Sequence, residues 1–124
     1  MLKTLWAFSI PFSMWLLAIV MWAGPTGQSD SQGFTGEVMD SLCAKDGTHD
    51  KMMDQMKSMG RDKATCTQKC IQLGAKYVLF DPAKKTFYEL DDQDKAAAFA
   101  GRKVEVKGTI DRKKIKVASI EPAD

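Results

Sequence analysis

One segment of the chain, residues 43–70, contains every cysteine and the only histidine. These residues are Cys43, His49, Cys66 and Cys70. Three thiolates and one imidazole form a Cys₃His set, which suits tetrahedral zinc. Cys66 and Cys70 are four residues apart, so both sulfur atoms would lie on one face of a helix. The sequence therefore predicts a metal site made of these four residues.

Methionines in the same segment suggest a second metal. Met52, Met53 and Met56 follow His49 closely, and soft thioethers beside thiolates would select Cu(I). Alternatively, Met52, Met56 and Met59 form the apolar face of a short helix whose other side chains are polar, because methionine is a common core residue. Zinc and Cu(I) both remain candidates at this point.

Two further interpretations of the cysteines involve no metal. A disulfide from Cys43 to Cys66 or Cys70 would suit an exported protein, but it leaves one thiol over. A redox-active pair of Cys66 and Cys70 is the other interpretation, although no thioredoxin-like βαβ pattern surrounds it. Cys66 is also expected in the first turn of its helix, where the helix dipole favours a thiolate.

The N-terminal segment predicts export. Lys3 precedes a long uncharged apolar run, as in a secretory signal, and the run is also long enough to span a bilayer. We expect a signal peptide or N-terminal membrane anchor in residues 1–23, a linker in 24–33 and one domain in 34–124. The expected location is the periplasm or the extracellular space, with the protein either free or anchored to the membrane by residues 5–23.

The charge balance and the motifs exclude several functions. The chain has 18 basic and 16 acidic side chains, so the clustered positive charge needed for nucleic-acid binding is not expected. A lone histidine without a second base gives little support for hydrolysis, and no Walker loop or dinucleotide fingerprint is present. We therefore expect a binding module and not an enzyme.

The elements that must position the cysteines are mostly strands. Apolar patterns predict five strands, at residues 34–42, 76–81, 86–90, 103–110 and 114–120. Helices are predicted at residues 49–59, at 66–73 behind a Thr65/Gln68 capping box, and at 94–100. The result is a mainly β protein, an OB-like five-stranded barrel. It has a helical insert between strands 1 and 2 and a helix between strands 3 and 4. An open five-stranded α+β sheet is the alternative.

Several stretches resemble a family of small exported bacterial proteins of unknown function. They are G-E-V-M-D-S-L-C-A-K at 36–45, C-x-x-x-C-I-x-x-G-A-K-Y-V-L at 66–79, T-F-Y-E-L-D-D-Q at 86–93, F-A-G-R-K-V-E-V-K-G-T-I-D at 99–111 and K-I-K-V-A-S-I-E at 114–121. The resemblance covers residues 36–121 and implies an OB-like β-barrel and export. The family's cysteine and histidine positions match Cys43, His49, Cys66 and Cys70, but no activity is implied.

Overall fold

Residues 30–123 are described by a computed structural model of the chain. The signal peptide or membrane anchor expected in residues 1–23 lies outside these residues. Among the described residues, no helix is long and apolar enough to cross a membrane.

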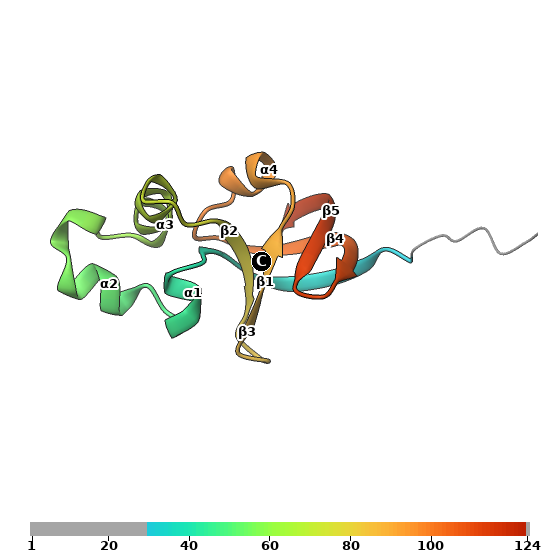
Figure 1. Cartoon of the computed structure of the whole chain (residues 1–124), viewed down its shortest axis with the longest axis horizontal. Coiled ribbons are helices and arrows are strands. Elements are labelled where there is room, and N and C mark those ends of the chain that lie inside the picture. The colour runs from blue at the N-terminus through green and yellow to red at the C-terminus, as the bar shows by residue number, and fades with distance from the viewer. Residues whose placement is uncertain (1–29, 124) are drawn as a thin grey trace, which may run out of the picture.

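Five strands form one sheet that closes into a barrel (Figure 1). They are β1 (Gln32–Asp40), β2 (Tyr77–Asp81), β3 (Thr86–Leu90), β4 (Lys103–Asp111) and β5 (Lys114–Pro122). Around the barrel the order is β1-β2-β3-β5-β4, and β4 pairs back onto β1. Only the β3–β5 pair is parallel. The prediction of a mainly β domain with five strands is confirmed, and the sheet is closed rather than open.

Short helices occupy two of the connections between strands. Those between β1 and β2 are α1 (Cys43–Asp46), α2 (Asp50–Gln55), the 3₁₀ turn η1 (Lys57–Met59) and α3 (Lys63–Gln72). We call residues 41–76 the insert. Helix α4 (Gln93–Ala97) lies between β3 and β4. Figure 1 shows the insert beside one end of the barrel, with α2 far from the strands.

The first helix predicted in the insert, residues 49–59, is broken. The backbone of Met56 is extended, with φ −127° and ψ 91°, so α2 ends at Gln55 and a separate 3₁₀ turn follows. The sequence has no glycine or proline at this break. Its pattern of polar residues and methionines therefore predicts one continuous helix.

The second predicted helix, residues 66–73, begins earlier than expected. Asp62 caps it, because its carboxylate accepts hydrogen bonds from the backbone N–H and the hydroxyl of Thr65, both at 2.8 Å. Helix α3 therefore starts at Lys63, and Thr65 lies inside its first turn. The Thr65/Gln68 capping box is thus wrong, because a better cap stands three residues before it.

Alternation along β1 and β2 separates two hydrophobic cores. Val38 and Leu79 are partners in the sheet and lie in the core of the barrel, whereas the next pair, Met39 and Val78, belongs to a second core. Successive side chains of a strand point to opposite faces, so the second core covers the outer face of this strand pair. We call it the insert core; it consists of Met39, Cys43, Ala44, Met59, Cys66, Cys70 and Val78.

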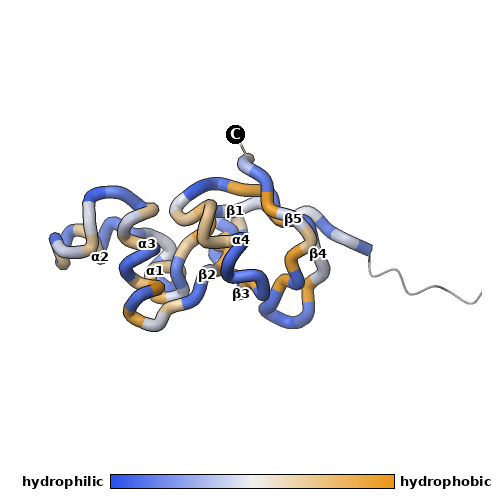
Figure 2. The backbone as a smooth tube through the Cα atoms, turned by 90° about the horizontal axis from the view of Figure 1, so that it is seen from above, coloured by the Kyte–Doolittle hydropathy of each residue, from blue (hydrophilic) through white to orange (hydrophobic). Residues whose placement is uncertain are grey.

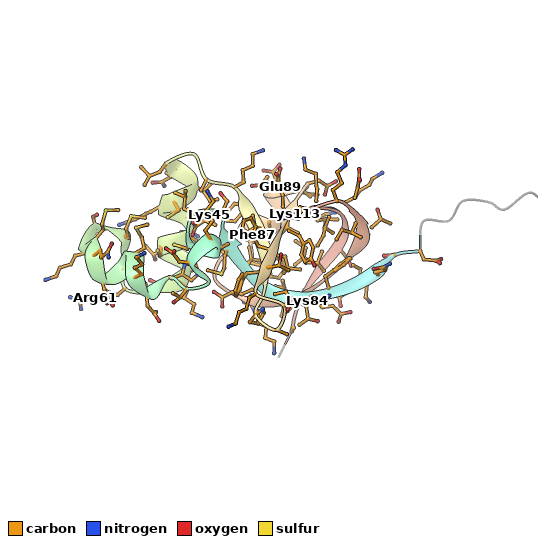
Figure 3. The ribbon with its side chains drawn as sticks, turned by 60° about the horizontal axis from the view of Figure 1, so that its bottom comes forward. Lys45, Arg61, Lys84, Phe87, Glu89 and Lys113 are labelled. Atoms are coloured by element: carbon orange, nitrogen blue, oxygen red, sulfur yellow. The ribbon has the colours of Figure 1, made fainter. Side chains whose placement is uncertain are left out.

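The insert core lies where the insert meets the barrel. Phe80 of β2 and Phe87 of β3 pack against it from the barrel side. Figure 3 places Phe87 close to Lys45 of α1, whereas Arg61 lies at the far end of the insert. Figure 2 shows that the backbone around α2 is mostly hydrophilic, whereas hydrophobic stretches recur along β4 and β5. Apolar packing in the insert is therefore concentrated near the barrel, and α2 contributes to it through the partly buried Met52 and Met53.

Gly101 allows α3 to contact the barrel closely. Its φ is +73°, and its N–H donates to the carbonyl of Val38 at 2.8 Å. A Cβ atom here would lie 2.6 Å from the backbone nitrogen of Ala64 and 2.8 Å from the carbonyl carbon of Lys63. Both are residues in the first turn of α3, so the helix that carries Cys66 is positioned by a contact that only glycine permits.

Replacing Gly101 by alanine is therefore expected to destabilise the protein more than the same change at Gly74. Gly74 also has a positive φ, +101°, but nothing lies within 4 Å of its Cβ position. Strain alone should cost about 1–2 kcal/mol in Gly74→Ala. The backbone collision should add roughly 1–3 kcal/mol in Gly101→Ala. Urea unfolding of both variants measures the difference, and equal losses would show that the contact with α3 has no energetic role.

Candidate metal centre

Three buried sulfur atoms converge in the insert core. Cys43 opens α1, and Cys66 and Cys70 lie one turn apart on α3. The three Sγ atoms all lie within 4.8 Å of one another, and the residues are at most 2% exposed. All three thiols are free, with no disulfide among them. The expected convergence of the cysteines is confirmed.

Asp40 positions Cys43. It is the last residue of β1 and is fully buried. Its Oδ1 accepts hydrogen bonds from the backbone N–H groups of Leu42 at 3.0 Å and Cys43 at 2.8 Å. Aspartate commonly turns the chain in this way, by bonding to N–H groups two and three residues on. The turn ends the strand and brings Cys43 against α3.

His49 lies beside Cys43 and Asp40. Its ring is 1% exposed, and a ring nitrogen lies within 4.8 Å of both the Cys43 sulfur and an Asp40 carboxylate oxygen. The structure thus places the four predicted residues in two groups that share Cys43. One is the cysteine triad, and the other consists of Asp40, Cys43 and His49. Asp40 was not predicted from the sequence as a site residue. The only indication of its role there is an aspartate three residues before a cysteine.

Glu37 holds the other side of the His49 ring. Its Oε1 is 3.1 Å from His49 Nε2, and its Oε2 accepts a hydrogen bond from Lys63 at 2.9 Å. Burial acts to raise the pKa of Glu37, but the hydrogen bonds from His49 and Lys63 outweigh it and lower the pKa below its usual value. Glu37 is therefore an ionised acceptor that orients the imidazole.

Burial raises the pKa of all three thiols. The pKa of Cys70 rises to about 12, through burial first and then through the charge of Asp40. The same two causes raise the pKa of Cys43. Burial also raises the pKa of Cys66, so the expected thiolate stabilised by a helix dipole is wrong there. Helix α3 begins at Lys63, so Cys66 lies deeper in the helix, and desolvation outweighs the dipole.

The methionines pack around the cysteines to different degrees. Met59 is 4% exposed and belongs to the insert core, and Met52 and Met53 pack against it partly buried. Met56 is 41% exposed. The expected apolar face of Met52, Met56 and Met59 is thus wrong at Met56, because the chain leaves the helix at this residue.

Two buried polar atoms near Cys43 have no hydrogen-bond partner. Within residues 30–123, the buried side-chain oxygen and nitrogen atoms without a hydrogen-bond partner are Asp40 Oδ2, His49 Nδ1 and Thr67 Oγ1. Thr67 follows Cys66 in α3, and the other two residues flank Cys43. Buried polar atoms are nearly always paired, and an unpaired one costs about 1–3 kcal/mol. Two of these three atoms belong to residues beside Cys43, where a polar or charged partner would stabilise them.

A cavity of about 170 Å³ lies beside this cluster. His49 lines it, together with Glu37, Thr48 and Lys63. The buried imidazole thus separates the sulfur atoms from a space in which water or a small ion fits.

Comparison of the chain with protein-family models, curated proteins and solved structures gave no match. Its function must therefore be argued from the chemistry of the site.

The raised thiol pKa values predict how stability depends on pH. Thiols of the unfolded chain ionise near pH 8.5, whereas the folded thiols stay protonated to higher pH. The stability of the reduced, metal-free protein should therefore be fully present below about pH 8 and fall above it, by up to about 1.4 kcal/mol per pH unit for each thiol. Urea unfolding between pH 7 and 9.5 measures this slope. The variant Cys43→Ser/Cys66→Ser/Cys70→Ser should show a flatter profile, and an unchanged slope would contradict the assignment to the thiols.

Proposed function

We propose that this protein is an exported metal-binding module whose primary site consists of Cys43, Cys66 and Cys70. The observation that carries the proposal is the convergence of three buried sulfur atoms within 4.8 Å of one another. A zinc ion lies about 2.3 Å from each thiolate ligand, which would set the sulfur atoms about 4 Å apart. The observed spacing thus needs little adjustment to hold an ion.

Zinc and Cu(I) are the ions that this donor set suits. Thiolates select both, and no member of the insert core carries a side-chain oxygen, although the Asp40 carboxylate lies near Cys43. Because the thiols are neutral in the metal-free protein, binding of an ion must release protons, as in other thiolate sites. The ion would cross-link α1, through Cys43, to α3, and would therefore also stabilise the insert.

Redox catalysis is less well supported. Reactive cysteines have lowered pKa values and partial exposure, whereas these thiols are buried with raised pKa values. A structural disulfide remains the competing interpretation, because the cysteines would meet oxidants after export.

Two sequence-based inferences complete the proposal. Export is inferred from Lys3 and the apolar run in residues 5–23, and the resemblance to a family of exported proteins supports it. An OB-type barrel is inferred from the five strands in one closed, mixed sheet.

Metal analysis combined with thiol titration tests the primary site. Protein isolated from the exported compartment should contain zinc or copper, and all three thiols should become titratable after the metal is removed. Cys66→Ser should weaken zinc binding roughly 100-fold or more, because it removes a ligand from the tetrahedral set. Met59→Leu is the matched control, since it changes a buried sulfur in the same core without removing a thiolate, and it should retain the metal. No bound metal together with one free thiol per chain would refute the proposal in favour of a disulfide.

The methionines are not expected to be ligands. Met56 is exposed, and Met52 and Met53 are accounted for by packing. The variant Met52→Leu/Met53→Leu/Met56→Leu should therefore bind Cu(I) within about threefold of the natural chain, since leucine preserves the packing. Competition with a Cu(I) chelator measures the affinity. A loss as large as that in Cys70→Ser would show that the thioethers coordinate copper.

A further inference from the structure

Two buried polar atoms without partners face each other beside Cys43. Asp40 Oδ2 and His49 Nδ1 are 3.9 Å apart, which is too long for a hydrogen bond. The remaining polar atoms of both side chains are engaged, because Asp40 Oδ1 holds two backbone N–H groups and His49 Nε2 contacts Glu37. The one unbonded side-chain atom of each residue therefore faces the region between the two side chains.

The contact with Glu37 determines which nitrogen of His49 carries the proton. Glu37 is paired with Lys63 and is a hydrogen-bond acceptor, so the neutral imidazole donates through Nε2 and keeps its lone pair on Nδ1. Asp40 Oδ2 also presents lone pairs. Two acceptors that face each other in a buried place repel, and a cation bound between them would relieve that repulsion. A histidine held through its second nitrogen by a carboxylate is the usual arrangement of a zinc ligand.

Cys43 supplies a third donor to this place. Its sulfur lies within 4.8 Å of the donor atoms of both Asp40 and His49, and it also belongs to the cysteine triad. We propose that Asp40, Cys43 and His49 bind a second metal ion, and that the Cys43 thiolate bridges it to the ion held with Cys66 and Cys70. This proposal rests on the function proposed above, because the bridge requires an ion in the triad.

The donor types select the ion for the second position. One carboxylate oxygen, one imidazole nitrogen and one thiolate suit zinc, whereas Cu(I) prefers sulfur alone. Three protein ligands leave the fourth position of a tetrahedral ion open to water or a small anion. The 170 Å³ cavity is lined by Glu37, His49 and Lys63 but by neither Asp40 nor Cys43, so the His49 ring lies between it and the other two ligands.

Zinc stoichiometry tests the second position. The reduced, metal-free full chain, titrated with Zn²⁺ against a colorimetric chelator, should bind two equivalents. Asp40→Asn should bind one, because asparagine keeps the oxygen that accepts from Leu42 and Cys43 and replaces the free carboxylate oxygen by an amide. His49→Gln should likewise bind one. Asp62→Asn is the matched control, since this carboxylate is exposed and bonds to Thr65 at the start of α3, and it should keep two equivalents.

Cobalt substitution gives a measurement that does not depend on variants folding. A bridging thiolate couples the spins of two Co²⁺ ions, so the magnetic moment per ion of the natural chain should fall when the second equivalent binds. One equivalent of zinc, unaffected by Asp40→Asn, would overturn the second position and leave the cysteine site standing. Additive moments at two equivalents would overturn the bridge. No binding of zinc or cobalt at all would instead overturn the primary site.

Discussion

The buried carboxylate of Asp40 is the constraint on which the rest of the insert depends. One oxygen turns the chain from β1 into α1 and thereby brings Cys43 to α3. The charge of the same fully buried group raises the pKa of the thiols of Cys43 and Cys70. A buried charge is costly unless it is paired, and the backbone N–H groups of Leu42 and Cys43 contact only one of its two oxygens. The fold thus buries a negative charge beside Cys43, where a bound cation would neutralise it.

The insert core is built mainly from sulfur-containing side chains. Five of its seven members are cysteine or methionine, against a single valine and a single alanine. A domain of this size buries a limited apolar core, and a metal cross-link is a common supplement. The barrel has its own core of aliphatic and aromatic residues and does not need this help. Metal binding would therefore change the order of the insert far more than that of the barrel.

The sequence predicts the barrel better than the site, for physical reasons. The strands could be predicted because their signals are local. Apolar Val104 and Val106 alternate with charged residues, and the spacing of apolar residues changes from helical to strand-like after residue 76. The spacing of Cys66 and Cys70 likewise predicts a shared helix face. The burial of Asp40, in contrast, is decided by the packing of α3 over the strand end. The break at Met56 carries no glycine or proline to reveal it.

Because β1 and β2 contribute to two cores on opposite faces, the chain can tolerate insertions and deletions at some positions and not at others. Val38 points into the barrel and Met39 toward the insert, so a slip of one residue in β1 would exchange them. The cysteine cluster holds the chain just beyond the end of β1. A residue inserted between Asp40 and Cys43 would therefore displace either the sulfur cluster or the strand register. Insertions near Arg61, at the far end of the insert, would disturb neither. Within the insert, length changes should therefore be tolerated better near Arg61 than between Asp40 and Cys43.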